Sequence, residues 1–329
     1  MKGIVNTKSG SLEDLKIMDI KMPIPKSKQV LIKVKASAIT NMEYMRYTKY
    51  ITEKKIGGIA SLIDTASGAR RKIIGIEISG IVEEVGKKVK DIKKGDEVYG
   101  ISAGMKGAWG EYAVANEREI YIKPNNFSFE QSAAVPVGAI TALGAVYAAK
   151  IQKGQQILIQ GGTGSVGHYA VQLSKIQGGI VTAVCSKNNI EMVRNIGADF
   201  VVDYKNENIT ANEKKYDVII AVNGYNPLSM YKKLLNKTGK YIFVGGSTKA
   251  MLSVFGIPFY SIGSKKFGVS GFPLLPKKKY LSDLKIYAEE GKFQPFIDKV
   301  YDPHNIYDAL RYIVNEHTQG KVVIKMDFH

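Results

Sequence analysis

Cysteine and tryptophan are the scarcest residues of this 329-residue chain, which contains one of each. A single cysteine excludes an intramolecular disulfide and any metal site that needs several thiolates. Cys185 ends an apolar run, and we interpret it as a small buried hydrophobic side chain rather than a nucleophile. The segment Met1–Asn6 lacks the apolar core of a signal peptide. We therefore expect a reducing, cytoplasmic location.

Long runs of large hydrophobic residues are also missing. The stretch most like a membrane span, residues 132–149, contains Pro136 and many Ala and Gly residues but little Leu, Ile or Phe. This composition favours a buried helix of a globular domain over a membrane span. We therefore expect no membrane partner.

Acidic residues are few: 30 Asp and Glu stand against 47 Lys and Arg, which gives a formal net charge of +17. Such a balance suggests an anionic partner, which could be a phosphorylated cofactor, a nucleic acid or a membrane surface. The lysines are dispersed along the chain, apart from a short cluster at Lys277–Lys279, and no aromatic–basic RNA motif is visible. A solvated lysine-rich surface is therefore favoured over a nucleic-acid groove.

Glycine turns divide the first part of the chain into short apolar runs. Residues 30–36, 76–86 and 109–114 predict strands, and the turn at Gly95-Asp96 introduces a further one. A section with many short strands and glycine turns is typical of a partly open barrel, so we expect this β-rich domain over residues 1–125.

After Pro124 helical and strand patterns alternate, which predicts an α/β fold with a doubly wound parallel sheet. The tail contains a helix near residues 304–316 and a last strand at 321–325. No helix follows this strand, so we expect it to return to the barrel. The predicted domains are therefore 1–125 with 272–329, and 126–271. The expected parallel strands span residues 156–160, 180–184, 200–202, 217–222, 241–245 and 267–270.

A glycine-rich loop follows the first of these strands and precedes a helical segment. Gly162, Gly164 and Gly167 form a GxGxxG pattern, and the strand 180–184 follows at the spacing of a βαβ unit. Gly162 permits a tight turn, Gly164 lets the backbone approach a pyrophosphate, and Gly167 allows close packing of helix on strand. The helix N-terminus offers free N–H groups to phosphates, so the pattern predicts a dinucleotide site that includes Ser165 and Val166.

Several short motifs occur along nearly the whole chain: Gly75-Ile76-Glu77, Gly95–Val98, Gly110–Tyr112, Ala133–Pro136, Thr141–Leu143, Gly161–Gly167, Gly197–Asp199, Asp203-Tyr204 and Gly320–Val323. Together they make the chain similar to the medium-chain dehydrogenase/reductase superfamily. The resemblance implies a GroES-like substrate domain formed by both ends of the chain, a central Rossmann domain and an active site in the cleft between them.

The chain departs from the zinc-dependent alcohol dehydrogenases of that superfamily. Where those enzymes have cysteine after an early strand and histidine before Glu77, this chain has Thr40 and Asn41, and Ile76. Tetrahedral zinc needs three or four Cys, His or carboxylate ligands, and Glu77 alone cannot hold it. The chain therefore resembles the zinc-free quinone oxidoreductase and enone reductase branch.

The resemblance implies reduction of a quinone or an α,β-unsaturated carbonyl compound. Without a Lewis acid, oxidation of an unactivated alcohol is difficult, whereas a conjugated carbonyl accepts hydride at its β-carbon. The reaction also needs a donor to the developing oxyanion and a source of a proton, and a tyrosine hydroxyl can serve as both. Tyr50 is our first candidate and Tyr44 the second; the alternative is that these aromatic side chains only line the cleft.

The residues after the second strand indicate which nicotinamide cofactor is used. An NAD site usually has Asp or Glu at the end of this strand, but Ser186 and Lys187 stand here, and the first acid is Glu191. Lys187 can pair with a 2′-phosphate and Ser186 can donate to it, so NADP(H) is favoured. The family resemblance adds Tyr204 beside that phosphate and Thr141 beside the nicotinamide. Asn223 and Gly245 follow further strands at the ligand-binding edge of the sheet.

Other functions remain possible from the sequence. Gly100–Gly104 matches the GxSxG pattern of hydrolases, but the residues after Ser102 are rich in glycine and predict no helix for a nucleophile elbow. A zinc-free alcohol dehydrogenase, an enoyl-thioester reductase, and a non-catalytic protein that binds NADPH or RNA are further alternatives. We expect the protein to form a homodimer. We expect its substrate to be a small-molecule electrophile.

Overall fold

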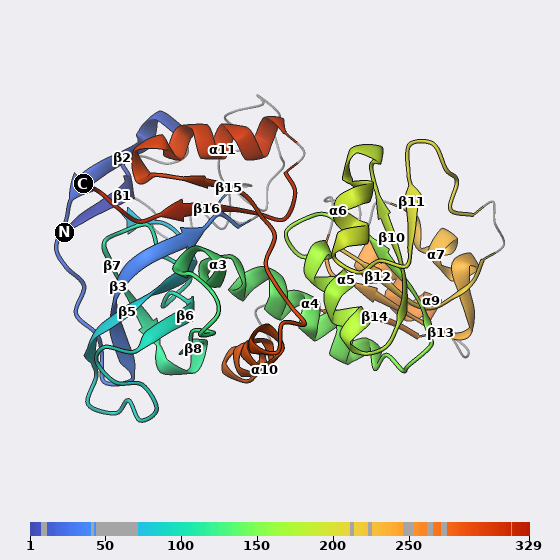
Figure 1. Cartoon of the computed structure of the whole chain (residues 1–329), viewed down its shortest axis with the longest axis horizontal. Coiled ribbons are helices and arrows are strands. Elements are labelled where there is room, and N and C mark those ends of the chain that lie inside the picture. The colour runs from blue at the N-terminus through green and yellow to red at the C-terminus, as the bar shows by residue number, and fades with distance from the viewer. Residues whose placement is uncertain are drawn as a thin grey trace. The chain divides into compact units, whose positions relative to one another are not determined.

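The computed structural model contains two compact units, which we describe separately (Figure 1). Unit 1 comprises Met1–Val137, Lys277–Glu290 and Gln294–His329, and unit 2 comprises Gly138–Pro276 and Gly291–Phe293. The structure describes residues 1–7, 12–40, 43, 72–210, 214–222, 226–245, 253–261, 266–270, 275–316 and 318–329.

Unit 1 is built on a large, mainly antiparallel sheet whose strands come from both ends of the chain. Its order is β15-β16-β3-β5-β6-β8, and β7 pairs with β3. The C-terminal β16 pairs antiparallel with β3, so the last strand returns to the N-terminal barrel as predicted. The strands are β3 (Gln29–Ala38), β5 (Glu77–Val85), β6 (Glu97–Ile101), β7 (Tyr112–Asn116), β8 (Ile120–Ile122), β15 (Ile297–Tyr301) and β16 (Lys321–Lys325).

A second, three-stranded sheet of order β2-β1-β4 and several helices complete unit 1. Tyr99 on β6 donates its hydroxyl to the Leu281 carbonyl at 2.6 Å, which fastens α10 to the barrel. These elements are β1 (Lys2–Asn6), β2 (Leu15–Asp19), β4 (Lys72–Ile73), α3 (Phe129–Ala134), α10 (Lys277–Glu289), α11 (Ile306–Asn315) and the single 3-10 turns η1 (Leu12–Asp14), η2 (Glu117–Glu119) and η6 (Pro303–Asn305).

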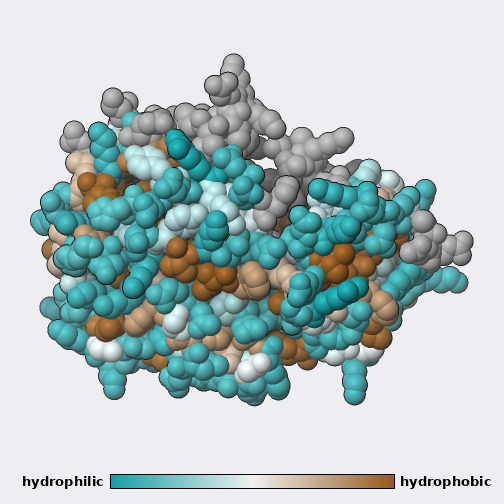
Figure 2. Space-filling view, turned by 45° about the horizontal axis from the view of Figure 1, so that its top comes forward, coloured by the Kyte–Doolittle hydropathy of each residue, from teal (hydrophilic) through white to brown (hydrophobic). Residues whose placement is uncertain are grey.

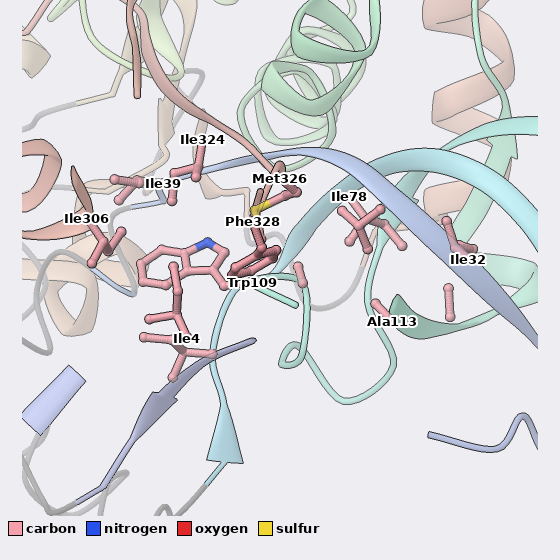
Figure 3. Packing of buried hydrophobic residues seen from close by; sticks show 14 of the residues in the cluster. Ile4, Ile32, Ile39, Ile78, Trp109, Ala113, Ile306, Ile324, Met326 and Phe328 are labelled. Carbon is pink, nitrogen blue, oxygen red and sulfur yellow. The ribbon is translucent and has the colours of Figure 1, made fainter. Parts of the chain in front are cut away.

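The only tryptophan of the chain lies in the core of unit 1. Trp109 is fully buried, and Ile4, Ile39 and Phe328 surround its indole (Figure 3). Gly75 has a φ of +96°, and an added Cβ would overlap the Trp109 ring. The chain before β5 can therefore pass close to the indole only because residue 75 is glycine.

Unit 2 is a doubly wound parallel sheet, as the alternating pattern predicted. In the described residues the strand order is β11-β10-β9-β12-β13-β14, with all strands parallel. From β9 the chain first adds strands on one side, up to β11, and then on the other side, from β12 to β14, and this order defines a Rossmann fold. The strands are β9 (Gln156–Gln160), β10 (Ile180–Cys185), β11 (Phe200–Asp203), β12 (Tyr216–Ala221), β13 (Leu235–Phe243) and β14 (Lys266–Val269). The α/β fold class is confirmed.

Of the helices that belong to unit 2, α4 comes before its first strand and the others lie between its strands in the chain. The predicted helix over 132–149 is in fact two helices, because Pro136 has no N–H with which to continue α3 and instead begins α4. The helices of this unit are α4 (Pro136–Ala149), α5 (Gly167–Ile176), α6 (Ile190–Asn195), α7 (Leu228–Leu234) and α9 (Ile257–Tyr260), together with the 3-10 turns η3 (Lys187–Asn189) and η4 (Ser253–Gly256).

The face of the molecule drawn in Figure 2 is predominantly polar. Hydrophilic side chains cover most of the face in Figure 2, and the apolar side chains lie between them in small groups. The described residues contain no helix that is both long enough and apolar enough to span a bilayer.

Candidate nucleotide site and buried charge cluster

The carboxyl ends of three neighbouring strands meet at one edge of the unit 2 sheet. Gln160 at the end of β9 pairs with Val184 of β10, and Cys185 at the end of β10 pairs with Asp203 of β11. The residues that follow these strands therefore lie next to one another. Ligands bind at this edge in open α/β folds, beside the point where the strand order reverses.

The glycine loop has the close contacts that its sequence predicts, with one shift in register. The left-handed backbone of the turn falls at Gly161, with a φ of +79°, and not at Gly162. An added Cβ at Gly167 would overlap the Gly161 carbonyl, so glycine is required where α5 begins. Gly164 differs, because an added Cβ would meet only the Gly161 oxygen, at 4.0 Å. The space above Gly164 is open.

A helix of the same unit packs against this loop. An added Cβ on Gly138 of α4 would overlap the Ser165 carbonyl and the Tyr169 ring, so Gly138 lets α4 approach the loop. Thr141 is three residues further on, hence on the same face of α4, and it is mostly buried. The sequence had pointed to Thr141 through the resemblance alone and had missed Gly138.

Ser186, Lys187 and Tyr204 come together at the ends of β10 and β11. The Tyr204 N–H donates to the Cys185 carbonyl at 3.2 Å, so Tyr204 lies beside the start of η3, where Ser186 and Lys187 are found. The Lys187 side chain is exposed, and Tyr204 keeps 44% of its surface exposed. One cation and two hydroxyl groups therefore stand at the edge where a dinucleotide presents its adenosine ribose.

Two acids hold the turn that follows β11, where Glu207 accepts from the Asp203 N–H at 3.0 Å. Asp203 is buried, and its carboxylate accepts from the Lys205 N–H at 3.1 Å and from Asn206 Nδ2 at 2.6 Å. Glu191 lies in α6, beyond η3. The turn after β10 is instead tied to the glycine loop, because Asn189 Nδ2 donates to Thr163 Oγ1 at 3.3 Å.

Gly245 lies at the same edge of the sheet, beside the end of β12. The Val222 N–H donates to the Gln160 carbonyl at 3.1 Å, and an added Cβ on Gly245 would lie 3.5 Å from the Val222 oxygen. Gly245 is therefore beside the chain that leaves β12. Asn223, predicted at this place, lies outside the described residues.

Unit 1 buries a cluster of three charged side chains. Lys321 donates to Glu77 Oε2, and the Val137 N–H at the start of α4 donates to Glu77 Oε1 at 2.6 Å. Glu43 accepts from the N–H of Thr40 at 2.9 Å and from its hydroxyl. Glu77 and Lys321 are at most 1% exposed, and Glu43 is 3% exposed.

The cluster contains two carboxyl groups and only one ammonium group. Burial therefore raises the pKa of both acids. Removal from water raises the pKa of Glu77 from 4.5 to about 7, although the Lys321 ammonium opposes the rise. Burial likewise raises the pKa of Glu43, against the two hydrogen bonds from Thr40. With both acids ionised the cluster would carry a buried net negative charge, so burial and the repulsion between the two carboxylates favour the protonated form of one of them.

The other predicted site residues are placed as follows. Tyr44 and Tyr50 lie outside the described residues. Ser102 is buried, and its hydroxyl lies 3.1 Å from the carbonyls of Gly75 and Ile76, to which it donates. The hydroxyl is thus part of the barrel backbone network and not exposed like a nucleophile. Across the described ranges no group of three His, Cys, Asp or Glu residues could hold a metal ion.

Comparison with known proteins agrees with this geometry. Residues 26–125 match the family described as "Alcohol dehydrogenase GroES-like domain", and residues 196–324 match "Zinc-binding dehydrogenase". The chain is 31% identical to the NADPH-dependent alkenal/one oxidoreductase of Arabidopsis thaliana over 98% of this chain and 79% of that protein. It is 29% identical to the chloroplast envelope quinone oxidoreductase homolog of the same plant, over 97% and 96% of the two chains.

A solved structure shows the same fold along its whole length. The quinone oxidoreductase from Coxiella burnetii superimposes with a TM-score of 0.84 at 27% identity, over 99% of both chains. The chain therefore belongs to the medium-chain dehydrogenase/reductase superfamily, in its quinone and enone reductase branch, and is an oxidoreductase. The resemblance drawn from the sequence motifs is confirmed.

Proposed function

We propose that the protein uses NADPH to reduce quinones or α,β-unsaturated carbonyl compounds, and that it does so without a metal ion. The observation that carries the choice of cofactor is the meeting of Ser186, Lys187 and Tyr204 at the ends of β10 and β11, where β10 is followed by Ser186 and Lys187 instead of an acidic residue. A cation and hydroxyl donors suit a 2′-phosphate, whereas a ribose 2′-hydroxyl calls for an acidic acceptor.

The glycine loop fits the rest of such a cofactor. The open space beside Gly164 admits a pyrophosphate, and α5 begins at Gly167, so the positive end of its helix dipole is close to that space. We assign Gly162, Gly164, Ser165, Val166 and Gly167 to phosphate binding. Thr141 and Gly245 border the same site, and Asn223 is assigned to it from the sequence.

The metal-free assignment follows from the donor set in unit 1. The Glu77 carboxylate is occupied by Lys321 and Val137, the Thr40 hydroxyl donates to Glu43, and Ile76 has no donor atom. These residues do not suit the zinc that the second matched family is named for.

The division of labour follows the two units. Unit 2 binds the dinucleotide, which supplies a hydride when it is bound, and unit 1 binds the acceptor molecule. The chain itself must donate a hydrogen bond to the acceptor oxygen and deliver one proton. We assign both tasks to Tyr50, with Tyr44 as the second candidate, because a phenol is both a donor and an acid. A cytoplasmic location and a homodimer remain part of the proposal.

The test is a panel assay of the purified protein. NADPH oxidation is measured against a quinone, an alkenal, an enone and an enoyl thioester, and each reaction is repeated with NADH and after dialysis against a chelator. We expect turnover of the first three acceptors, a preference for NADPH, and full activity after chelation. Loss of activity that added zinc restores would refute the metal-free assignment, and a preference for NADH would refute the cofactor assignment.

A further inference from the structure

Two lysine-rich turns of unit 1 that are distant in the sequence lie side by side. Lys26-Ser27-Lys28 precedes β3, and the chain from Lys87 to Lys94 follows β5. The Lys88 N–H donates to the Ser27 carbonyl at 2.7 Å, and the Gly86 N–H donates to the Gln29 carbonyl at 2.8 Å. Figure 1 shows the connection from β5 to β6, in cyan, beside the start of β3.

These turns bring six exposed ammonium groups together, which we call the lysine ridge: Lys26, Lys28, Lys87, Lys88, Lys90 and Lys93. The ion pairs of the described residues include none of the six. The nearby acids are engaged elsewhere: Asp91 with Lys278 at 2.6 Å, and Glu83 with Lys94 at 3.8 Å.

Two further acids near the ridge hold backbone groups. Glu117 accepts from the N–H groups of Lys90 and Asp91 at 2.7 Å each, and Asp96 accepts from the Lys93 N–H at 2.9 Å. Glu84 is exposed on β5 and is the remaining acid of this region. These carboxylates keep their charge, but segments 20–28 and 83–96 together contain eight lysines and four acids, and Glu117 adds a fifth acid. The ridge therefore has an excess of positive charge.

Large apolar side chains are exposed beside the ridge. Ile24 lies two residues before Lys26 and keeps 76% of its surface exposed, and Met22 keeps 44%. Ile24 has the highest exposed fraction among the large aliphatic side chains of the described residues. The segments 20–28 and 85–95 contain no aromatic residue.

We propose that the lysine ridge, with Ile24 and Met22, is a docking surface for an anionic lipid bilayer. A row of ammonium groups attracts acidic headgroups, and adjacent aliphatic side chains enter the interface between headgroups and acyl chains. The missing aromatic side chains argue against RNA, since proteins that bind single strands stack bases on such rings. The sequence-based expectation of no membrane partner rested on the lack of a spanning segment, and a peripheral contact needs none. This contact adds a partner to the reductase without altering its chemistry.

The experiment is co-sedimentation of the full chain with vesicles. Vesicles of phosphatidylcholine alone are compared with vesicles that also contain phosphatidylserine, at low and at high salt. We expect binding only to the anionic vesicles, and weakening by salt. Each lysine near such a surface contributes about fivefold, so replacement of Lys87, Lys88 and Lys90 by Gln is expected to weaken binding by about a hundredfold. Ile24→Ser is expected to weaken it further at fixed salt.

A control variant separates this site from the general charge of +17. Lys153, Lys233 and Lys266 are exposed lysines of unit 2, and their replacement by Gln removes the same charge. Binding must survive in this variant. Equal losses in both variants, equal binding to neutral vesicles, or no binding at all would overturn the proposal. So would displacement of the protein from vesicles by an RNA whose affinity also depends on Lys87, Lys88 and Lys90. NADPH turnover of each variant is measured in parallel and reports on the proposed function separately.

Discussion

The carboxylate of Glu77 and the ammonium of Lys321 are paired in the interior of unit 1, although 244 residues separate them in the chain. Glu77 begins β5, and Lys321 begins β16, which reaches it by pairing with β3. The same carboxylate accepts the Val137 N–H at the start of α4. One acid thus joins three segments of unit 1, and a second acid, Glu43, increases the negative charge around it.

This arrangement predicts that stability falls as the pH rises. A carboxyl whose pKa is about 7 in the folded protein and 4.5 when unfolded binds a proton more tightly in the folded state. Its contribution is complete below pH 4.5, is lost as the pH rises to about 7, and is constant above that. The total change is about 3 kcal/mol, and we expect urea unfolding at a series of pH values to show it as a slope of about one proton.

Two variants assign that proton to the cluster. Glu43→Gln removes one buried acid and with it the repulsion that adds to the rise in the pKa of Glu77, so the slope between pH 5 and 7 is expected to become shallower, while burial of Glu77 keeps part of it. Lys321→Met leaves two buried acids without a cation, so it is expected to destabilise the fold by about 3–5 kcal/mol at neutral pH and to steepen the slope. Glu83→Gln on the same strand is the control and should behave as wild type. An unchanged slope in Glu43→Gln contradicts the prediction.

Two glycines of the loop should have different effects when they are replaced by alanine. Gly167→Ala forces a Cβ into the Gly161 carbonyl, and we expect a loss of about 1–3 kcal/mol in unfolding free energy together with loss of cofactor binding. Gly164→Ala places its Cβ in open space, so the thermal unfolding temperature should not change. NADPH binding should nevertheless weaken about tenfold or more, or about 1.4 kcal/mol. Wild-type NADPH affinity in Gly164→Ala would show that the loop does not contact the cofactor.

The regular parts of the fold were predictable from the sequence. The parallel strands of unit 2 are continuous apolar runs separated by helical patterns, so β9, β10 and β12 appear within a residue or so of their predicted bounds. The glycine loop and the ends of β10 and β11 follow from the same pattern, and for that reason the candidate nucleotide site could be located before the structure was known.

Features that depend on tertiary contacts were not predictable. Lys26 and Lys88 look dispersed in the sequence and become neighbours only because β3 and β5 pair antiparallel, with Val30 opposite Val85. The pairing of Glu77 with Lys321 requires β16 to return across the barrel. The turn at Gly161, one residue earlier than expected, rests on a positive φ at that glycine, whose place in the loop a GxGxxG pattern does not specify.

Cofactor preference should depend on Lys187. Its exposed ammonium would pair with the 2′-phosphate, which NADH lacks, and a charge-assisted contact of this kind is worth about 1.5–3 kcal/mol. Lys187→Ala is expected to raise the Michaelis constant for NADPH about ten- to a hundredfold and to leave that for NADH nearly unchanged. Lys233→Ala, an exposed lysine of α7, serves as the control.

Ser186→Asp should lower kcat/KM for NADPH and raise kcat/KM for NADH. An acid at the end of β10 would repel the 2′-phosphate and accept the 2′-hydroxyl of NADH, so the ratio of kcat/KM values should move toward NADH. Equal effects of Lys187→Ala on both cofactors would show that this lysine is a bystander.

The proton donor can be identified among the tyrosines that follow β3. If Tyr50 delivers the proton, Tyr50→Phe removes the general acid. We then expect kcat to fall about a hundredfold or more, while the Michaelis constant for NADPH stays the same. Tyr44→Phe tests the second candidate donor in the same way, and Tyr47→Phe is the matched control from the same stretch of sequence. Stopped-flow measurement of NADPH oxidation, in water and in deuterium oxide, then separates hydride transfer from protonation. If all three variants keep wild-type kcat and the same solvent isotope effect, the proton comes from solvent and the tyrosines only line the site.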